Sequence, residues 1–182
     1  MYELKRVEKG EEKRALEFIN DAKKYLKENG VNQWQNGYPN ISTIERDAEL
    51  ERGYFIIKDG EEIGYVCIDF GGEPGYEKID GKWKSNGKYS VIHRMTIKNT
   101  FRNSGIAFEV FRLAEELTLK NKIYSVKVDT DNSNKKMQHI ISKSGYEYCG
   151  IIISEDGGER LAYEKTLKNY KKTCKKLLTD AK

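Results

Sequence analysis

Apolar side chains recur along this chain with two periods, and the period predicts where helices and strands lie. Over residues 11–28 they return every three or four positions, as on one face of an α-helix, and they are Ala15, Leu16, Phe18, Ile19, Ala22, Tyr25 and Leu26. Gly30 then ends this helix. The same spacing predicts further helices over residues 42–52, with Ser42 as the N-cap, and over residues 105–119 and 134–144.

Alternating or wholly apolar runs between turn residues predict the strands. They cover residues 4–7, 54–57, 62–70, 89–97, 123–128, 146–153 and 161–164. The pair Asp59-Gly60 is a strong hairpin signal, and Asp156-Gly157-Gly158 separates the last two strands in the same way. Residues 71–88 are rich in glycine and charged residues and show neither the helical nor the strand pattern, so we expect a long connecting segment there.

The order of these elements predicts an α/β (α+β) fold. Hairpins favour antiparallel pairs, whereas each strand-helix-strand passage in the second half of the chain favours a parallel pair. We therefore expect a mixed, strongly twisted sheet of six or seven strands flanked by about four helices.

Length and composition fit this picture. A chain of 182 residues with 37% hydrophobic side chains can bury its core as one domain, which we assign to residues 1–165. No apolar run is long enough to cross a membrane, and the chain does not open with an apolar leader. We expect a soluble, cytoplasmic protein.

The remaining residues, 166–182, predict a basic amphipathic helix. Lysines fill its polar positions, and its apolar residues recur at helical spacing: Leu167, Tyr170, Cys174, Leu177 and Leu178. We favour docking of this helix on the domain or on a second subunit of a homodimer. Nucleic acid is the less favoured partner, because only Tyr170 provides an aromatic or arginine side chain among the lysines.

The cysteines and histidines indicate chemistry without a metal. Cys67, Cys149 and Cys174 are widely spaced, and none has another cysteine or a histidine at metal-ligand spacing. The only histidines, His93 and His139, lie far apart in the chain. We expect reduced, structural thiols.

The candidate chemistry lies in a turn between the strand that ends at Ile97 and the helix that follows. A helix start presents unpaired backbone N–H groups and a partial positive charge, so it can bind phosphate. Small residues let phosphates approach the backbone, and the turn consists of Arg102, Asn103, Ser104, Gly105, Ile106 and Ala107. It matches neither the nucleoside-triphosphatase motif Gly-x-x-x-x-Gly-Lys-Ser/Thr nor the dinucleotide motif Gly-x-Gly-x-x-Gly.

This combination resembles the GNAT superfamily of acetyltransferases, whose signature is a strand followed by Gln/Arg-x-x-Gly-x-Gly/Ala at the head of a helix. Farther along, Asn134-Lys135-Lys136-Met137 and Gly145-Tyr146 resemble the family's Asn-x-x-Ala/Met and Gly-Phe/Tyr elements at the family's spacing. The order of elements matches from about residue 4 to residue 165. The resemblance implies the acyl-CoA N-acyltransferase fold, with acetyl-CoA (coenzyme A) as the cosubstrate.

The resemblance also implies the residues that bind the cosubstrate. Backbone groups of Met95, Thr96 and Ile97 would bind the pantetheine arm, in a gap between their strand and the one that begins near residue 123. A backbone N–H near Met95 would polarise the thioester carbonyl. The turn would bind the pyrophosphate, and the Asn134 element, with Met137, would reach the pantetheine or the adenosine.

A base is needed if an amine attacks the thioester, because an alkylamine with a pKa of about 10.4 is protonated at neutral pH. Our candidate is His93, which regular alternation would place on the same strand face as Met95. The alternative is a histidine that only fills space. Ile141 stands where many members of this family place a tyrosine that protonates the leaving thiolate, so we assign no general acid.

The acceptor site is less clear from the sequence. Trp34 and Tyr38 could form an aromatic wall for a substrate, although packing in the core is the interpretation we favour for both. Asp69, Glu73 and Asp129 could bind a cationic acceptor.

We therefore predict an acetyltransferase that acts on a primary amine of a small molecule or peptide. An antibiotic, a polyamine, an amino acid and a protein N-terminus all remain open as acceptors. The alternative is a non-catalytic acyl-CoA-binding regulatory module.

Overall fold

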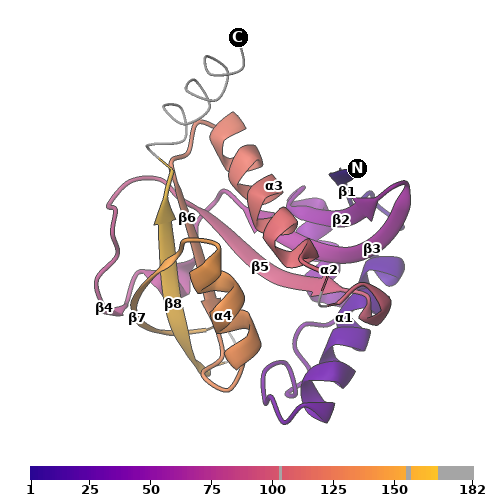
Figure 1. Ribbon diagram of the computed structural model, residues 1–182, viewed down its shortest axis with the longest axis horizontal. Coiled ribbons are helices and arrows are strands. Elements are labelled where there is room, and N and C mark those ends of the chain that lie inside the picture. The colour runs from indigo at the N-terminus through magenta and orange to yellow at the C-terminus, as the bar shows by residue number, and fades with distance from the viewer. Residues whose placement is uncertain (103, 155–156, 168–182) are drawn as a thin grey trace.

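The computed structural model describes residues 1–102, 104–154 and 157–167. Its centre is an eight-stranded sheet in the order β1-β2-β3-β5-β6-β8-β7-β4 (Figure 1). The strands are β1 (Tyr2–Arg6), β2 (Gly53–Lys58), β3 (Glu61–Asp69), β4 (Asp80–Gly81), β5 (Ser90–Ile97), β6 (Ser125–Thr130), β7 (Glu147–Ile153) and β8 (Glu159–Thr166). Only β5 and β6 pair in parallel, which confirms the predicted mixed sheet.

The strand count is higher than predicted because of β4. This two-residue strand pairs with β7 inside the segment 71–88, where the sequence carries no strand pattern. The predicted helix over residues 166–182 falls almost wholly outside the described residues, and Thr166 itself ends β8. Within the described part of the chain, none of the helices is both long and apolar enough to span a membrane.

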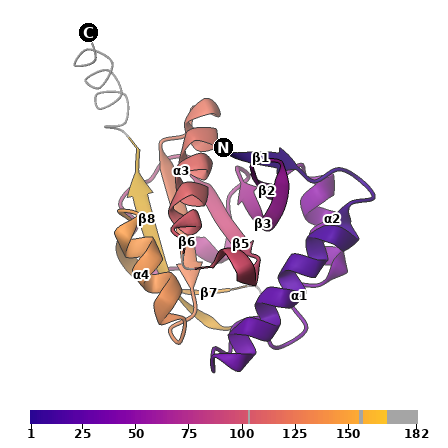
Figure 2. The same cartoon turned by 45° about the vertical axis from the view of Figure 1, so that its right-hand side comes forward.

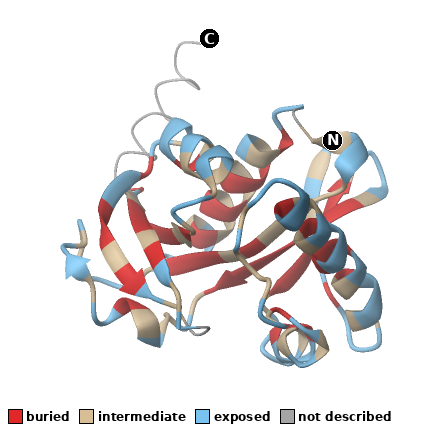
Figure 3. Ribbon diagram, turned by 90° about the horizontal axis from the view of Figure 1, so that it is seen from below, coloured by how far each residue is buried: buried red, intermediate tan, exposed pale blue. Residues whose placement is uncertain are grey.

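In the described part of the chain four α-helices cover the two faces of the sheet, as predicted (Figures 1 and 2). They are α1 (Glu12–Glu28), α2 (Ile41–Glu49), α3 (Ile106–Lys120) and α4 (Lys135–Lys143). Along β2, Phe55 and Ile57 pack with α1 and α2, whereas Ile56 packs with α3 and α4. Buried positions therefore run through the middle of the sheet between the two helical layers (Figure 3).

The predicted N-cap of α2 was wrong. Asn40, not Ser42, caps this helix: its Oδ1 accepts from the Thr43 N–H at 3.2 Å, and the Thr43 hydroxyl accepts from the Asn40 N–H at 3.2 Å. The Ser42 hydroxyl donates to the same Asn40 oxygen at 2.6 Å. This reciprocal capping box starts the helix at Ile41, one residue before Ser42.

A β-bulge interrupts β5 at Arg94, whose φ is +53°. Tyr65 of β3 pairs with Thr96 and Cys67 pairs with His93, so Arg94 and Met95 together stand opposite Val66. The extra residue breaks the alternation that we assumed. Met95 packs with Ile92 against the α3 side, whereas His93 faces a pocket on the other side of the sheet. The prediction that His93 and Met95 share a face was therefore wrong.

The β5–β6 ladder is short. Its pairs run from Ser90–Val126 to Ile92–Val128 and do not continue along the second half of β5. The predicted gap between these two strands is thus present, and it opens beside Met95, Thr96 and Ile97.

Candidate active site

A cleft of about 570 Å³ occupies the gap between β5 and β6, and we name it the cofactor cleft after the role that we propose for it below. Its floor includes Met95, Thr96 and Ile97, and the turn at Gly105 closes one wall. The end of α1 and the start of α4 form the other walls. The cleft therefore brings together nearly all the residues that the sequence analysis assigned to cosubstrate binding.

The turn before α3 presents backbone donors to this cleft. Gly105 precedes the helix with φ +79°, a conformation that favours glycine. Within the described part of the chain, the N–H groups of Gly105, Ile106 and Ala107 have no hydrogen-bond acceptor. A Cβ added at Gly105 would have no heavy atom within 4 Å, so the space before these amides is open. Such a helix start suits an anion.

The side chains of Arg102 and Ser104 in this turn form contacts within the protein. The Arg102 Nε donates to the carbonyl of Ile97 at 3.1 Å, and its guanidinium carbon lies 3.8 Å from the centre of the Tyr25 ring. Burial lowers the pKa of Arg102. The Ser104 hydroxyl donates to the carbonyl of Phe101, so it is not aimed at the cleft as a donor. Asn103 lies outside the described residues.

A second, smaller pocket of about 70 Å³ adjoins the cleft. The two cavities share five wall residues, which are Gln33, Trp34, Ile92, Arg94 and Asp129. His93 lines only the smaller one, and we name this cavity the acceptor pocket after the role that we propose for it below.

His93 faces a carboxylate in the acceptor pocket. Its Nε2 lies 3.3 Å from Glu73 Oε2, and both side chains are 14% exposed. This buried nitrogen has no hydrogen-bond partner among the described residues. His93 holds the pKa of Glu73 below its usual value, against the opposite effect of burial.

Comparison with known proteins places this geometry in a family. The model of the acetyltransferase (GNAT) family matches residues 16–146. The crystal structure of a GNAT-family acetyltransferase from Streptococcus agalactiae is 32% identical, with a TM-score of 0.80 over 91% of this chain and 95% of that chain. The chain belongs to the GNAT acetyltransferase family.

More distant structures share the fold of this GNAT acetyltransferase. A GNAT-family acetyltransferase from Listeria monocytogenes has a TM-score of 0.71 at 19% identity, covering 91% of this chain and 95% of that chain. The aminoglycoside acetyltransferase AAC(6')-Ib in complex with coenzyme A has a TM-score of 0.69 at 17% identity, covering 95% and 99%. No curated protein matches the sequence.

In this GNAT acetyltransferase the Asn134 element lines the cofactor cleft but also has a structural role. Asn134 Oδ1 accepts from the Met137 N–H at 3.1 Å and so caps α4. Its Nδ2 donates to Gln33 Oε1 at 3.1 Å, which joins α4 to the loop after α1. Met137 lines the cleft, whereas Ile141 is fully buried in the core.

Trp34 and Tyr38 line the acceptor pocket, and neither is among the buried hydrophobic residues of the core. Trp34 also reaches the cofactor cleft, and the Tyr38 hydroxyl accepts from Arg94 Nη1 at 2.6 Å. Among the three candidate acids, Glu73 and Asp129 line the acceptor pocket, whereas Asp69 pairs with Arg52 instead.

Sequence reasoning missed several residues that line the two cavities, and two of them have clear roles in the acceptor pocket. Tyr76 is 2% exposed and donates its hydroxyl to Asp129 Oδ1 at 2.6 Å. Burial, reinforced by Asp129, raises the pKa of Tyr76 well above its usual value. The second is Arg94. Its charge within a strand that also contains the apolar Ile92 and Met95 was the signal in the sequence that could have identified it.

The described residues contain no group of three or more histidine, cysteine or acidic side chains placed to hold a metal. Cys67 and Cys149 are buried free thiols, and burial raises the pKa of Cys67 to about 12. Cys174 lies outside the described residues.

Proposed function

We propose that this GNAT acetyltransferase transfers an acetyl group from acetyl-CoA to a primary amine. One observation carries the proposal: the cofactor cleft and the acceptor pocket meet at a common wall that includes Ile92, Arg94 and Asp129. A thioester bound beside Met95 would therefore face an amine bound beside His93.

The cleft has the groups that coenzyme A needs. Open amides at Gly105, Ile106 and Ala107 would bind its pyrophosphate. The edge of β5 that β6 leaves unpaired would bind the pantetheine arm through backbone groups, in the manner of an added strand. The volume of about 570 Å³ lies within the usual range for ligand pockets.

His93 would act as the base. The amine nitrogen attacks the thioester carbonyl carbon, the C–S bond breaks, and the proton of the amine passes to the imidazole. Glu73 stands beside His93 and would stabilise the imidazolium that forms. The bulge at Arg94 turns His93 toward the acceptor pocket and Met95 toward the cofactor cleft, which separates the two roles on opposite faces of β5.

The leaving thiolate has no assigned acid, because Ile141 is buried in the core. A thiol with a pKa of about 8.5 can leave without protonation, so the reaction does not depend on such a residue.

A panel of amines tests this proposal. Thiol release from acetyl-CoA would be followed with polyamines, amino acids, a peptide N-terminus and kanamycin, because AAC(6')-Ib has been crystallised with coenzyme A and kanamycin. We expect release with at least one class and transfer of one acetyl group per thiol by mass spectrometry. A non-catalytic acyl-CoA-binding module would bind acetyl-CoA but release no thiol with any acceptor, and that result would contradict the proposal.

A further inference from the structure

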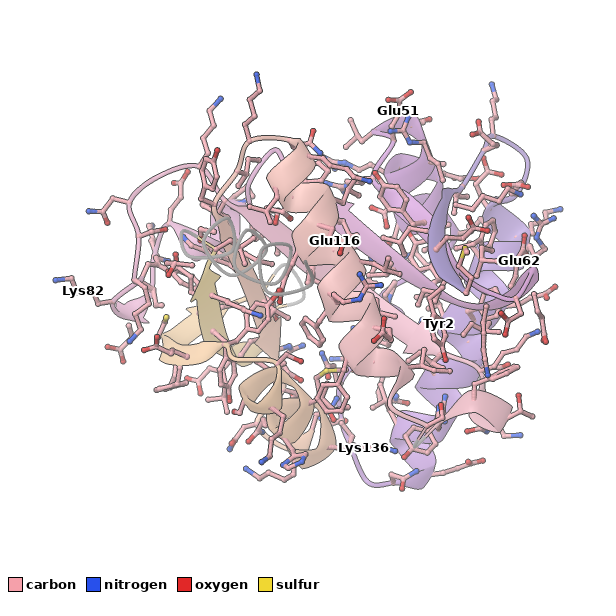
Figure 4. The ribbon with its side chains drawn as sticks, turned by 45° about the horizontal axis from the view of Figure 1, so that its top comes forward. Tyr2, Glu51, Glu62, Lys82, Glu116 and Lys136 are labelled. Atoms are coloured by element: carbon pink, nitrogen blue, oxygen red, sulfur yellow. The ribbon has the colours of Figure 1, made fainter. Side chains whose placement is uncertain are left out.

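Two cationic side chains meet on one phenol ring in the cofactor cleft. The Arg102 guanidinium carbon lies 3.8 Å from the centre of the Tyr25 ring. Lys136, in the first turn of α4, donates its Nζ to the Tyr25 hydroxyl at 3.2 Å. All three side chains line the cleft, and none lines the acceptor pocket. Lys136 lies on the side of α4 that faces α1 (Figure 4).

Three separate elements bring these groups together. Tyr25 belongs to α1, Arg102 to the turn before α3, and Lys136 to α4. The aromatic face attracts the Arg102 guanidinium, and the hydroxyl accepts from the Lys136 ammonium. Two positive charges are therefore held close together by a neutral side chain. Burial lowers the pKa of Arg102, and this effect is larger than the electrostatic raising by Asp21 and Glu28.

The order of groups in coenzyme A indicates what this cationic pair would meet. This step rests on the proposed function, with the thioester beside Met95 and the pyrophosphate at Gly105. The 3′-phosphoadenosine follows the pyrophosphate in the molecule, so it must continue away from the acceptor pocket. Arg102 lies three residues before Gly105, and Arg102 and Lys136 line the cleft but not the acceptor pocket.

We propose that Lys136, with Arg102 beside it, binds the 3′-phosphate of coenzyme A and makes the protein prefer the 3′-phosphorylated cosubstrate to its dephosphorylated form.

The chemistry of the exchange favours the phosphate. A phosphate monoester carries a charge of about −1.5 to −2 at neutral pH and has three acceptor oxygens. The ammonium of Lys136 is attracted to a phosphate by full opposite charges, whereas the phenol offers it only a neutral oxygen. Lys136 would therefore leave the phenol for the phosphate, while the Tyr25 ring keeps Arg102 in place. Because Lys136 is exposed, solvent and salt reduce the gain.

Calorimetry with coenzyme A and 3′-dephospho-coenzyme A tests the proposal. In the wild-type protein we expect the dephosphorylated form to bind roughly tenfold more weakly at low salt, a difference typical of one partly exposed charge-assisted contact. Lys136→Met should reduce this ratio to about threefold or less, mainly by weakening coenzyme A. The affinity for 3′-dephospho-coenzyme A should change little.

Lys135→Met is the matched control. Lys135 is the neighbouring lysine on α4, is exposed, and donates to Asn132 Oδ1 at 3.2 Å. It does not line the cleft, so the variant should keep the wild-type ratio.

The outcomes separate this proposal from the proposed function. Equal binding of the two forms by the wild type, or an unchanged ratio in Lys136→Met, overturns the 3′-phosphate site while coenzyme A binding still supports the acetyltransferase assignment. Failure of the wild type to bind either form overturns both.

Discussion

Arg94 donates two hydrogen bonds to the carboxylate of Asp47, from Nε to Oδ2 at 2.9 Å and from Nη2 to Oδ1 at 2.7 Å. Asp47 lies in α2 and is 0% exposed, and Arg94 is the residue at the β5 bulge. The same carboxylate accepts from Tyr65 at 2.6 Å and from Arg52 at 2.9 Å. Through Arg94 Nη1 the network continues to Tyr38 in the acceptor pocket. The Arg94–Asp47 ion pair thus joins α2 to the bulge, and the hydrogen bond from Arg94 joins both to the loop that carries Tyr38.

Asp47→Ala should strongly destabilise the protein. The substitution leaves the Arg94 guanidinium buried without its carboxylate, which typically costs about 3–5 kcal/mol in the free energy of unfolding. Urea denaturation measures this loss. Glu45→Ala, an exposed carboxylate in the same helix, should change stability by less than about 0.5 kcal/mol. A loss below about 1 kcal/mol for Asp47→Ala would mean that the ion pair does not hold the bulge.

Gly64→Ala should disturb β5, the strand that we propose binds the pantetheine arm. A Cβ at Gly64 would lie 2.1 Å from the carbonyl oxygen of Thr96, so β3 must shift away from β5. We expect a loss of about 1–3 kcal/mol in stability, typical of overpacking, together with weaker coenzyme A binding. Gly87→Ala is the control, because its Cβ would meet no heavy atom within 4 Å. A Gly64→Ala protein with wild-type stability and affinity would contradict the close contact.

His93→Ala should lower the rate of acetyl transfer at least about tenfold at saturating acetyl-CoA, because the amine loses its base. The control is His139→Ala, which removes the chain's other histidine from the cofactor cleft rather than from the acceptor pocket. Its maximal rate should stay near that of the wild type. Equal maximal rates for both variants would leave His93 with a packing role only.

Glu73→Gln should change how stability depends on pH. His93 lowers the pKa of Glu73, so the folded protein favours the carboxylate more than the unfolded chain does. That stabilisation is present above the ordinary glutamate pKa of about 4.3 and is lost as the pH falls through the lower folded pKa. The advantage of wild type over Glu73→Gln in urea denaturation should therefore shrink from about pH 5 to about pH 3. An advantage that grows toward acid pH would reverse the sign of this argument.

Features set by local pattern could be predicted from the sequence. The apolar spacing of α1 and the Asp59-Gly60 turn between β2 and β3 both lie where the pattern placed them. The turn before Ile106 was also found, because a strand, small residues and an amphipathic helix follow one another within a few positions.

Features that depend on distant contacts could not be predicted. The bulge at Arg94 is held by Asp47, which lies 47 positions away, whereas a periodicity argument assumes a regular strand. Tyr76 lies in the patternless segment 71–88, and its place is set by Asp129, 53 positions away. The α2 cap was missed for another reason, since Asn40 and Ser42 are both good capping residues and only the reciprocal bonds with Thr43 decide between them.

We propose that the amides at the start of α3 bind the pyrophosphate of coenzyme A. Gly105→Glu tests it, because the added carboxylate would occupy the open space before these amides and repel phosphate. Gly157→Glu is a matched control: φ is +79° at Gly105 and +78° at Gly157, and neither Cβ would meet a heavy atom within 4 Å.

The measurement is calorimetric titration of the wild type and both variants with coenzyme A. We expect the wild type and Gly157→Glu to bind with similar affinity and Gly105→Glu to bind at least about tenfold more weakly. Wild-type protein that does not bind coenzyme A, or Gly105→Glu protein that binds it as well as the wild type does, would contradict the account.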